Sequence, residues 1–523
     1  MQLRCARQIA VVFLHLLPLL GRVSALEIDV NDPNSIKQAA SSATWDMMTY
    51  YHGNETGAIP GYFHSWWEGA ALFLALLNYW HTTGDTTYNK ELTIGLQWQD
   101  QGSGKYMPAN WSTGIGNDDQ MFWGIAAMTA AEYKFPNPPT GDTWLTLAEG
   151  VFYDQSSDNG QGWDTTICEG GLRWQKFIAQ SGYVMKNAVS NGGFMMLAAR
   201  LAYYNQKDSF AAWAEKTWDW ATTAGMIVNT TATWSIWDSL SKGTGGIVPD
   251  CTGPGHTQWT YNYGTFITGC AYMYAYKFGP VGIKGYAITN DTKWLYRTNK
   301  LLDALFQGFF LAKTGGGISD QTCEATDQCD EDANDPLFKG LTISWLMDVA
   351  LVVPTLKPKI LPKIQITASL AGPACTGHGG IACGGHLYGQ YDGQASMENQ
   401  ITAVQVFSAA MLPYLKADAA PANVDTGGNS SSDAKPGGGD TDASLPVYKN
   451  ITTGDRAGAG ILTVLFITGL ASMGGFLVDG RMTCTPGLLE DVQIRGILVT
   501  IYQNLWFSFL PTTSIPFRNS YLL

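Results

Sequence analysis

The chain has 523 residues, of which 45% are hydrophobic, and its formal net charge is −13. This length and apolar content are enough for a large buried core and, by length alone, for two or three domains. The negative charge argues against a nucleic-acid partner, because binding to phosphates depends on clustered Lys and Arg. The 19 Trp, 24 Tyr and 21 Phe favour a carbohydrate ligand, because sugar rings stack on aromatic faces.

Residues 1–25 have the pattern of a secretory signal peptide. Arg4 and Arg7 precede an apolar run that ends at Leu20, and Ala25 closes a small-residue cleavage site. We therefore expect the mature protein to pass through the secretory pathway to the plasma membrane or cell wall, on the extracellular face. Sequons for N-glycosylation agree with that route; they lie at Asn54, Asn110, Asn229, Asn290, Asn429 and Asn450.

Apolar helical patterns alternate with more polar ones between residues 35 and 415. Short turns separate the members of each pair, at residues 83–85, 140–142, 207–208 and 289–291. Their unequal spacing indicates a repeated helical hairpin with variable loops. With about six such pairs and few strand patterns, the sequence predicts an all-α fold over residues 26–416. We expect a toroid of inner and outer helices with the long loops on one face.

The longest connections are rich in Gly, Trp, Asn and Asp. They span residues 99–116, 154–190, 227–263 and 315–339. Loops of this length in a compact domain are usually functional. The alternative is that their Trp side chains only cover the ends of a helical barrel.

The composition changes after the last helical pattern. Residues 417–456 are rich in Gly, Ser and Asp, which predicts a disordered stalk. An uncharged apolar tail follows at residues 457–478 and predicts a membrane anchor. It is either the tail of a glycosylphosphatidylinositol signal or a transmembrane helix; the candidate attachment sites of the lipid anchor are Asp442-Ala443-Ser444, Asn450 and Gly454. Residues 479–523 form an extension without a clear pattern.

Cysteine and histidine spacing predicts disulfides rather than a metal site. In an oxidising compartment the natural local pairs are Cys323–Cys329 and Cys375–Cys383. Cys251–Cys270 is a further candidate, which would leave Cys168 free. Cys375, His378, Cys383 and His386 could imitate a zinc site, and the acidic run 327–335 lacks the spacing of a calcium loop. We expect no metal and no cofactor.

Two adjacent acids, Asp118 and Asp119, stand where a loop becomes a buried helix that runs from about Met121 to Phe135. Hydrolysis of a glycosidic bond needs two carboxyl groups, and close neighbours suit a retaining mechanism. Their pKa values must then split, so that one ionises and the other keeps a proton. The alternative is that Asn117 caps the helix and both Asp complement its dipole.

Several motifs together resemble glycoside hydrolase family 76, and within it the fungal cell-wall mannan endo-1,6-α-mannosidases of the Dcw/Dfg group. The resemblance covers roughly residues 30–415 and rests on Gly116-Asn117-Asp118-Asp119-Gln120, Gly162-Trp163-Asp164, Cys168-Glu169-Gly170-Gly171-Leu172-Arg173-Trp174-Gln175, Lys186-Asn187-Ala188-Val189-Ser190-Asn191-Gly192, Thr260-Tyr261-Asn262-Tyr263-Gly264 and Phe338-Lys339-Gly340.

The resemblance implies an (α/α)6 barrel and retaining action on α-1,6-linked mannose. It assigns Asp118 as nucleophile and Asp119 as acid/base. It also implies a mannan or glycosylphosphatidylinositol glycan as substrate, with a wall glucan as an acceptor in cell-wall biogenesis. The alternatives are a catalytically inactive carbohydrate-binding protein and a structural wall protein.

For the substrate contacts, aromatic and amide side chains in these motifs are the candidates. Each could instead serve loop structure or the core. The expected ring platforms are Trp66, Trp67, Trp174 and Tyr263, and the expected hydroxyl partners are Asp164, Asn187, Asn191 and Asn262.

Overall fold

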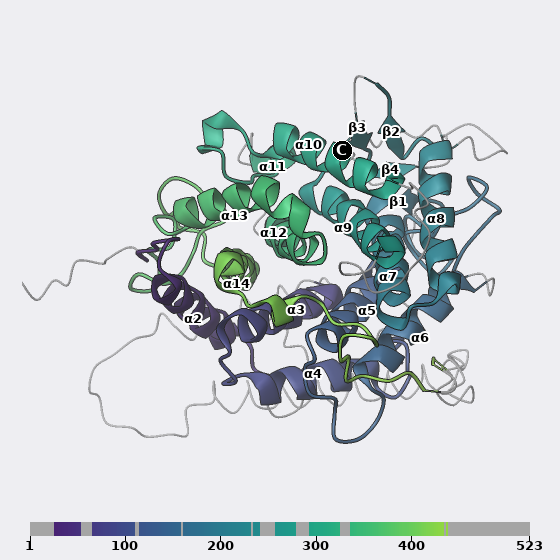
Figure 1. The fold of residues 1–523 in the computed structure, drawn as a ribbon, viewed down its shortest axis with the longest axis horizontal. Helices are drawn as coiled ribbons and strands as arrows, with labels where there is room; N and C mark the ends of the chain where they lie inside the picture. The colour runs from purple at the N-terminus through teal and green to yellow at the C-terminus, as the bar shows by residue number, and fades with distance from the viewer. Residues whose placement is uncertain are drawn as a thin grey trace, which may run out of the picture. The chain divides into compact units, whose positions relative to one another are not determined.

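The computed structural model describes residues 26–53, 65–109, 114–157, 161–231, 234–240, 251, 257–278, 292–324, 335–433 and 436–437. All of them belong to one compact unit, Met1–Pro446. Within it the helices alternate along the chain between an outer layer and an inner ring (Figure 1). Each inner helix packs against the next, and the last packs against the first, so the ring is closed. This confirms the predicted all-α, (α/α)6 architecture.

The inner ring consists of α3 (Trp66–Thr83), α5 (Asn117–Glu132), α7 (Ala188–Asn205), α9 (Thr260–Phe278), α12 (Asp335–Val352) and α14 (Met397–Ala410). The outer layer consists of α2 (Pro33–Tyr50), α4 (Asn89–Asp100), α6 (Trp144–Ser156), α8 (Asp208–Thr223), α10 (Lys293–Phe309) and α13 (Lys357–Ala371). Shorter helical turns are α11 (Gln321–Glu324), η2 (Ala312–Thr314), η3 (Pro354–Leu356), η4 (Leu412–Tyr414) and η5 (Ala417–Ala419).

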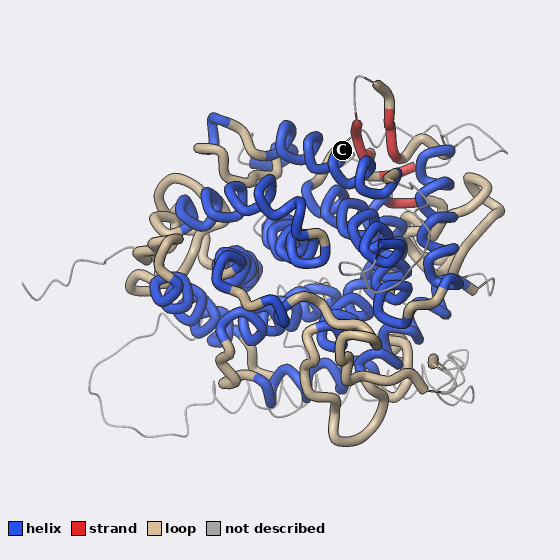
Figure 2. The backbone as a smooth tube through the Cα atoms, viewed as in Figure 1, coloured by secondary structure: helices blue, strands red, loops and turns tan. Residues whose placement is uncertain are grey.

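Strands occur only in the connections between the described helices (Figure 2). β1 (Lys186–Asn187) pairs antiparallel with β4 (Ser239–Leu240), with Asn187 opposite Ser239. β2 (Ile227–Asn229) pairs antiparallel with β3 (Trp234–Ile236). The first of these small sheets joins two of the long loops and places residue 238 beside the start of α7.

The sequence of each helix explains its layer. In α5, Met121, Trp123 and Ile125 point in different directions around the helix, yet all are 0% exposed. In α10 the buried residues form one stripe that includes Trp294 and Leu305, whereas Tyr296 is 55% exposed. A helix that is apolar on every face belongs inside, and an amphipathic helix belongs outside.

A polar cluster fills the ring at the C-terminal ends of the inner helices. Arg200 of α7 forms an ion pair with Glu132 of α5 at 2.5 Å, and both side chains are fully buried. The Tyr133 hydroxyl donates to Asp348 of α12 at 2.6 Å. Burial raises the pKa of Glu132 to about 7, although Arg200 opposes the shift. Buried charges of this kind are tolerated because each has a partner, and the cluster closes this end of the ring.

The chain after α14 stays on the barrel. The backbone N–H of Ala422 donates to the carbonyl oxygen of Glu132 at 2.8 Å, and that of Val424 donates to the carbonyl oxygen of Tyr204 at 3.0 Å. Ala422 is 1% exposed. We call residues 417–433 the C-terminal strap, because they cross the ends of α5 and α7.

The strap then reaches the start of α6. The hydroxyl oxygen of Ser430 accepts the backbone N–H of Leu145 at 3.0 Å, and the carbonyl oxygen of Ser431 accepts the Thr143 hydroxyl at 2.5 Å. The prediction of a disordered stalk from residue 417 is therefore wrong for residues 417–433. Apart from 436–437, the rest of the predicted stalk, the apolar tail and the extension lie outside the described residues.

The disulfides differ in part from the sequence prediction. Cys375–Cys383 is confirmed, which also removes the zinc alternative at these residues. Cys168 is not free, because it pairs with Cys251 across a Cα–Cα distance of 5.5 Å. The predicted Cys251–Cys270 pair is wrong, because Cys270 is a buried free thiol within α9. Cys323 is disulfide-bonded, but its predicted partner Cys329 lies outside the described residues.

The signal peptide and four of the sequons, Asn54, Asn110, Asn290 and Asn450, also lie outside the described residues. Asn229 and Asn429 are exposed, as glycosylation would require, and their modification stays a prediction. Within the described residues no single helix has the length and apolar character to cross a bilayer. The sharply bent pair Pro336–Val352 and Pro354–Ala371 meets that test only when taken together.

Candidate active site

A cavity of about 540 Å³ opens where the inner helices begin. The first turns of α3, α5, α7, α9 and α12 contribute to its wall, and helix N-termini favour negative charge. The described residues that line it are Ser65, Trp66, Trp67, Gly114, Ile115, Asp118, Asp119, Phe122, Trp174, Gln175, Met185, Asn187, Val189, Asp238, Tyr261 and Phe338.

The adjacent acids Asp118 and Asp119 lie in this wall, in the first turn of α5. Asp119 caps the helix, because its Oδ2 accepts the backbone N–H of Gly116 at 2.6 Å. Asp118 Oδ1 accepts the backbone N–H of Asp119 at 3.0 Å, and Asp118 Oδ2 accepts the side-chain amide of Asn187 at 2.8 Å. The expectation that Asn117 caps the helix is wrong, since its amide donates to the carbonyl oxygen of Arg173 at 2.9 Å.

The electrostatics of the pair follow from its burial. Burial raises the pKa of Asp119 to about 6. Burial also raises the pKa of Asp118 well above its usual value, and the charge of Asp119 raises it further. The amide of Asn187 and nearby backbone N–H groups oppose this shift. Two buried carboxyl groups on adjacent residues resist double ionisation, so together they hold a proton at a pH where isolated aspartates would not.

Aromatic rings form much of the remaining wall. Trp67 stacks on Phe122 with ring centroids 4.4 Å apart, and Tyr261 stacks on Phe338 at 3.7 Å. The indole N–H of Trp66 donates to the side-chain oxygen of the buried Gln99 at 2.7 Å, and this bond fixes the orientation of the ring. Rigid aromatic faces with a few polar groups suit a sugar, which presents apolar ring faces and hydroxyl edges.

Four of the eight predicted substrate contacts line the cavity: Trp66, Trp67, Trp174 and Asn187. Their contact with a sugar stays a prediction. The other four, Asp164, Asn191, Asn262 and Tyr263, are not in the wall, and each makes hydrogen bonds within the protein instead.

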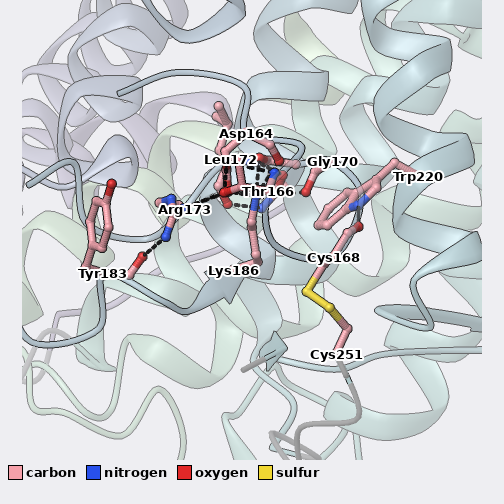
Figure 3. Close-up of polar contacts among 12 residues, drawn as sticks. Asp164, Thr166, Cys168, Gly170, Leu172, Arg173, Tyr183, Lys186, Trp220 and Cys251 are labelled. Atoms are coloured by element: carbon pink, nitrogen blue, oxygen red, sulfur yellow. Dashed lines mark hydrogen bonds and ion pairs between the residues drawn. A yellow bond between two sulfur atoms is a disulfide. The ribbon is translucent and has the colours of Figure 1, made fainter. Parts of the chain in front are cut away.

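Asp164 belongs to a loop anchor rather than to the wall (Figure 3). Its Oδ2 pairs with Lys186 at 2.9 Å and with Arg173 at 3.1 Å. Its Oδ1 accepts the backbone N–H and the hydroxyl of Thr166. Burial raises the pKa of Asp164, but the hydrogen bonds from Thr166 and the charge of Lys186 outweigh it and hold the pKa below its usual range. An acceptor so fully engaged has little left to offer a ligand.

The predicted amide partners on α7 and α9 face the wrong way for the cavity. Asn191 exchanges two hydrogen bonds with the backbone of Leu172, at 2.7 and 3.0 Å. Asn262 donates to Asp238 at 3.0 Å. Tyr263 is buried and receives the backbone N–H of Ile236 at 3.3 Å. On α9, Asn262 and Tyr263 follow Tyr261 by one and two residues and lie about 100° and 200° around the helix from it, so they face away from the wall that Tyr261 lines.

Sequence reasoning missed several wall residues. The most important is Asp238, a third carboxyl group whose pKa is raised by burial. It lies inside a long loop with no local pattern, directly before β4, and contacts with distant residues hold it at the cavity: the pairing of β4 with β1, the N–H of Ala188 and the amide of Asn262. Tyr261 and Phe338 belong to the motifs at residues 260–264 and 338–340, but the sequence does not show that their side chains face the cavity. Within the described ranges no cluster of His, Cys, Asp and Glu is arranged to hold a metal ion.

Comparisons with known proteins agree on one family. The family model for glycosyl hydrolase family 76 matches residues 35–423. The chain is 35% identical to the mannan endo-1,6-alpha-mannosidase DCW1 of Saccharomyces cerevisiae over 84% of its own length and 93% of that protein. It is 31% identical to the mannan endo-1,6-alpha-mannosidase DFG5 of Candida albicans, with 86% and 95% covered.

Solved structures show the same fold. The crystal structure of Dfg5 from Chaetomium thermophilum in complex with glucosamine matches with a TM-score of 0.69 and 32% identity, covering 78% of this chain and 97% of that one. The GH76A alpha-1,6-mannanase from Salegentibacter sp. HEL1_6 matches with a TM-score of 0.55 and 19% identity, covering 72% and 98%. An inactive variant of that enzyme, with two consecutive aspartates changed to asparagine, is known in complex with alpha-1,6-mannotriose.

Proposed function

Because the chain belongs to glycoside hydrolase family 76, we propose that it cleaves or transfers within α-1,6-linked mannose chains. The observation that carries the proposal is the Asp118–Asp119 pair in the wall of an aromatic cavity. The curated relatives named as mannan endo-1,6-alpha-mannosidases support the substrate class. The inactive double variant of the bacterial enzyme supports the choice of two consecutive aspartates.

The reaction we propose is a double displacement. The carboxylate of Asp118 attacks the anomeric carbon, the glycosidic bond breaks, and Asp119 gives its proton to the departing oxygen. Asp119 then takes a proton from the incoming hydroxyl group, whose oxygen attacks the anomeric carbon and releases Asp118. Water as the incoming group gives hydrolysis, and a sugar hydroxyl gives transfer. A wall glucan is the acceptor that we expect.

Hydrogen bonding supports these roles. Both oxygens of Asp118 accept N–H groups, which favours its ionised form. Asp119 engages the protein through Oδ2, so we assign the proton to its Oδ1. The charge of Asp119 works against an ionised Asp118. The nucleophile is therefore ionised only while Asp119 keeps the proton.

We also propose that the protein is secreted and held at the cell surface. The described disulfides and the fungal cell-wall relatives support passage through the secretory pathway. We propose that the apolar tail at residues 457–478 anchors the protein to the membrane at the cell surface, by a lipid anchor or as a helix. The proposed order is then signal peptide, barrel with its C-terminal strap, a stalk after residue 433, the anchor and the extension at residues 479–523.

The test is turnover of α-1,6-mannotetraose with and without a glucan acceptor, followed by mass analysis of the products. Shortened products mean hydrolysis, and lengthened products mean transfer. Activated aryl mannosides with added azide separate the roles. Asp119→Ala should give the α-azide through the covalent intermediate, whereas Asp118→Ala should give the β-azide by direct attack. Mannoside binding by the wild type without any turnover would show a carbohydrate-binding protein instead.

A further inference from the structure

Lys186 is a buried lysine that the proposed chemistry does not use. Its side chain is 0% exposed and lies next to Asn187, the residue that donates to Asp118. Its ammonium group donates to the carbonyl oxygens of Asp164, Gly170 and Gly171 at 2.8, 2.8 and 2.7 Å (Figure 3). A fourth contact reaches the Asp164 carboxylate at 2.9 Å. A desolvated cation is kept here only because every donor has an acceptor.

The carbonyl groups that Lys186 holds belong to an unusual turn, residues 168–171. Its four φ angles are all positive: 55° at Cys168, 55° at Glu169, 156° at Gly170 and 84° at Gly171. A residue with a Cβ in the left-handed region costs about 1–2 kcal/mol, so two in succession need external support. The last two positions are glycines, which adopt positive φ angles without a steric cost. At Gly171 a Cβ would also lie 2.4 Å from the Trp220 ring.

Three contacts from different parts of the fold support this turn. Lys186 binds its last two carbonyl groups from strand β1. Trp220 of α8 donates its indole N–H to the carbonyl oxygen of Cys168 at 2.8 Å. The Cys168–Cys251 disulfide ties the turn to the loop that precedes α9. Of the three, only Lys186 also belongs to the strand that carries Asn187.

The chain leaving this turn builds one side of the cavity. The carbonyl oxygen of Trp174 accepts the backbone N–H of Asn117, the first residue of α5, at 2.8 Å. Gln175 forms a bridge with Gly116, the helix cap. Trp174 and Gln175 both line the cavity. The path of residues 172–175 therefore decides where this wall stands relative to Asp118.

We propose that Lys186 is a positioning residue of the active site, whose ammonium group fixes the 168–171 turn and thereby seats Trp174 against the Asp118–Asp119 pair. The inference rests on the proposed function only for its kinetic consequence. Its structural consequence is independent of any substrate.

The charged form of Lys186 is the one that binds carbonyl groups. Burial lowers the pKa of Lys186 to about 8, the Asp164 carboxylate opposes the shift and the Arg173 guanidinium adds to it. Protonation is therefore complete below pH 7 and is lost as the pH rises through about 8. The wall should loosen over that interval in the wild type.

The first test is amide hydrogen exchange on the full chain with Lys186→Met, and with Asp164→Asn as a milder variant should the first fail to fold. We expect faster exchange at Trp174, whose N–H donates to Met185, and at Asn117, with the outer helices unchanged. Lys359→Met removes a surface ion pair with Asp303 and is the matched control. Unchanged exchange at Trp174 and Asn117 in a folded Lys186 or Asp164 variant overturns the proposal.

The second test is kinetic. Lys186→Met should raise KM for α-1,6-mannotetraose about tenfold, and Trp174→Ala should add little to it in the double variant, since both remove the same wall. Wild-type KM should rise above pH 8, and the variant should lack this rise. Additive effects overturn the positioning role. A wild type without turnover refutes the proposed function, while the exchange result still decides the role of Lys186.

Discussion

Asp119 caps the helix that carries it, because its carboxylate accepts the N–H of Gly116 at 2.6 Å while the same side chain lines the cavity. One oxygen therefore has a structural task, and the other is left for the substrate. The arrangement fixes the rotamer of the acid without a further residue. Removal of the side chain should therefore lower both the stability of the fold and the activity, each through a different oxygen.

The two tasks can be separated by substitution. Asp119→Asn keeps an oxygen for the Gly116 N–H but has no proton to give, so we expect activity on mannooligosaccharides to fall by about 10²–10⁴-fold, with the melting temperature at pH 4 retained. Asp119→Ala loses both tasks and should also lose about 1 kcal/mol of stability. Turnover assays with thermal unfolding check both. Equal melting temperatures for the two variants would contradict the capping role.

Removal of the nucleophile should stabilise the fold. The raised pKa of Asp118 means that the unfolded chain ionises more readily than the folded one. The stability that such a group contributes is complete below its unfolded pKa of about 3.9 and is lost as the pH rises through the folded value. Asp118→Asn should thus raise the melting temperature at pH 7 but change it little at pH 4, while activity falls more than about a thousandfold. Melting curves at both pH values provide the measurement, and an equal gain at pH 4 would count against this explanation.

The pH dependence of activity should show the acid. The first step needs one proton on the Asp118–Asp119 pair, so kcat/KM should fall as the pH rises through the range where the pair loses that proton; burial raises the pKa of both carboxyl groups and so places this range above that of isolated aspartates. The rate should be measured from pH 4 to 8 in matched buffers. An aryl mannoside with a good leaving group needs no proton and should show a weaker decline. An identical decline for both substrates would assign the pH dependence to another group.

The cavity should prefer neutral glycans. Asp118, Asp119 and Asp238 line it, and no Lys or Arg is among its described wall residues. A phosphate on the bound mannose meets like charge, which costs several kcal/mol, so we expect KM for a phosphorylated oligosaccharide to rise at least about tenfold. Asp238→Asn should reduce this penalty. A phosphorylated substrate that binds as well as the neutral one would be incompatible with the charge of the wall.

The C-terminal strap should be part of the folding unit. A chain that ends at residue 416 loses, among others, the bonds of Ala422 and Val424 to the inner helices and the bond of Ser430 to Leu145 of α6. At about 0.5–1.5 kcal/mol for each hydrogen bond, we expect a loss on the order of 3 kcal/mol. A chain that ends at residue 437 is the matched control and should unfold like the full protein. The free energy of unfolding in urea measures the difference, and equal values for both truncations would show that the strap is dispensable.

The sequence predicted what depends on local pattern. Apolar residues on every face of α5 predicted a buried helix, and adjacent acids at its start predicted the site. Asp238 could not be predicted, because it reaches the cavity through contacts with residues far away in the sequence, which include the β1–β4 pairing and the amide of Asn262. The Cys168–Cys251 disulfide could not be predicted for the same reason, since its two residues are 83 positions apart.

Composition misled at the strap. Gly, Ser and Asp are typical of disordered segments, which bury too little apolar surface to fold alone. Here the segment is ordered by hydrogen bonds to a surface that the rest of the chain provides, and small residues such as Ala422 fit closely against it. At Asn191 and Asn262 the sequence predicted ligand contacts, but both amides are bound within the protein. Their amides suit a sugar, but the backbone and Asp238 use them first.

The strap also decides how the barrel bears a mechanical load. Tension applied to the chain beyond residue 433 reaches Ser430, Ser431 and Asp433 first, and these residues are bound to Thr143, Leu145 and Thr146 at the start of α6. The outer layer, together with α7 through Tyr204, therefore takes up the force before α14 does. A pull on the C-terminal end of the barrel is thus shared between two layers and does not act on the last inner helix alone.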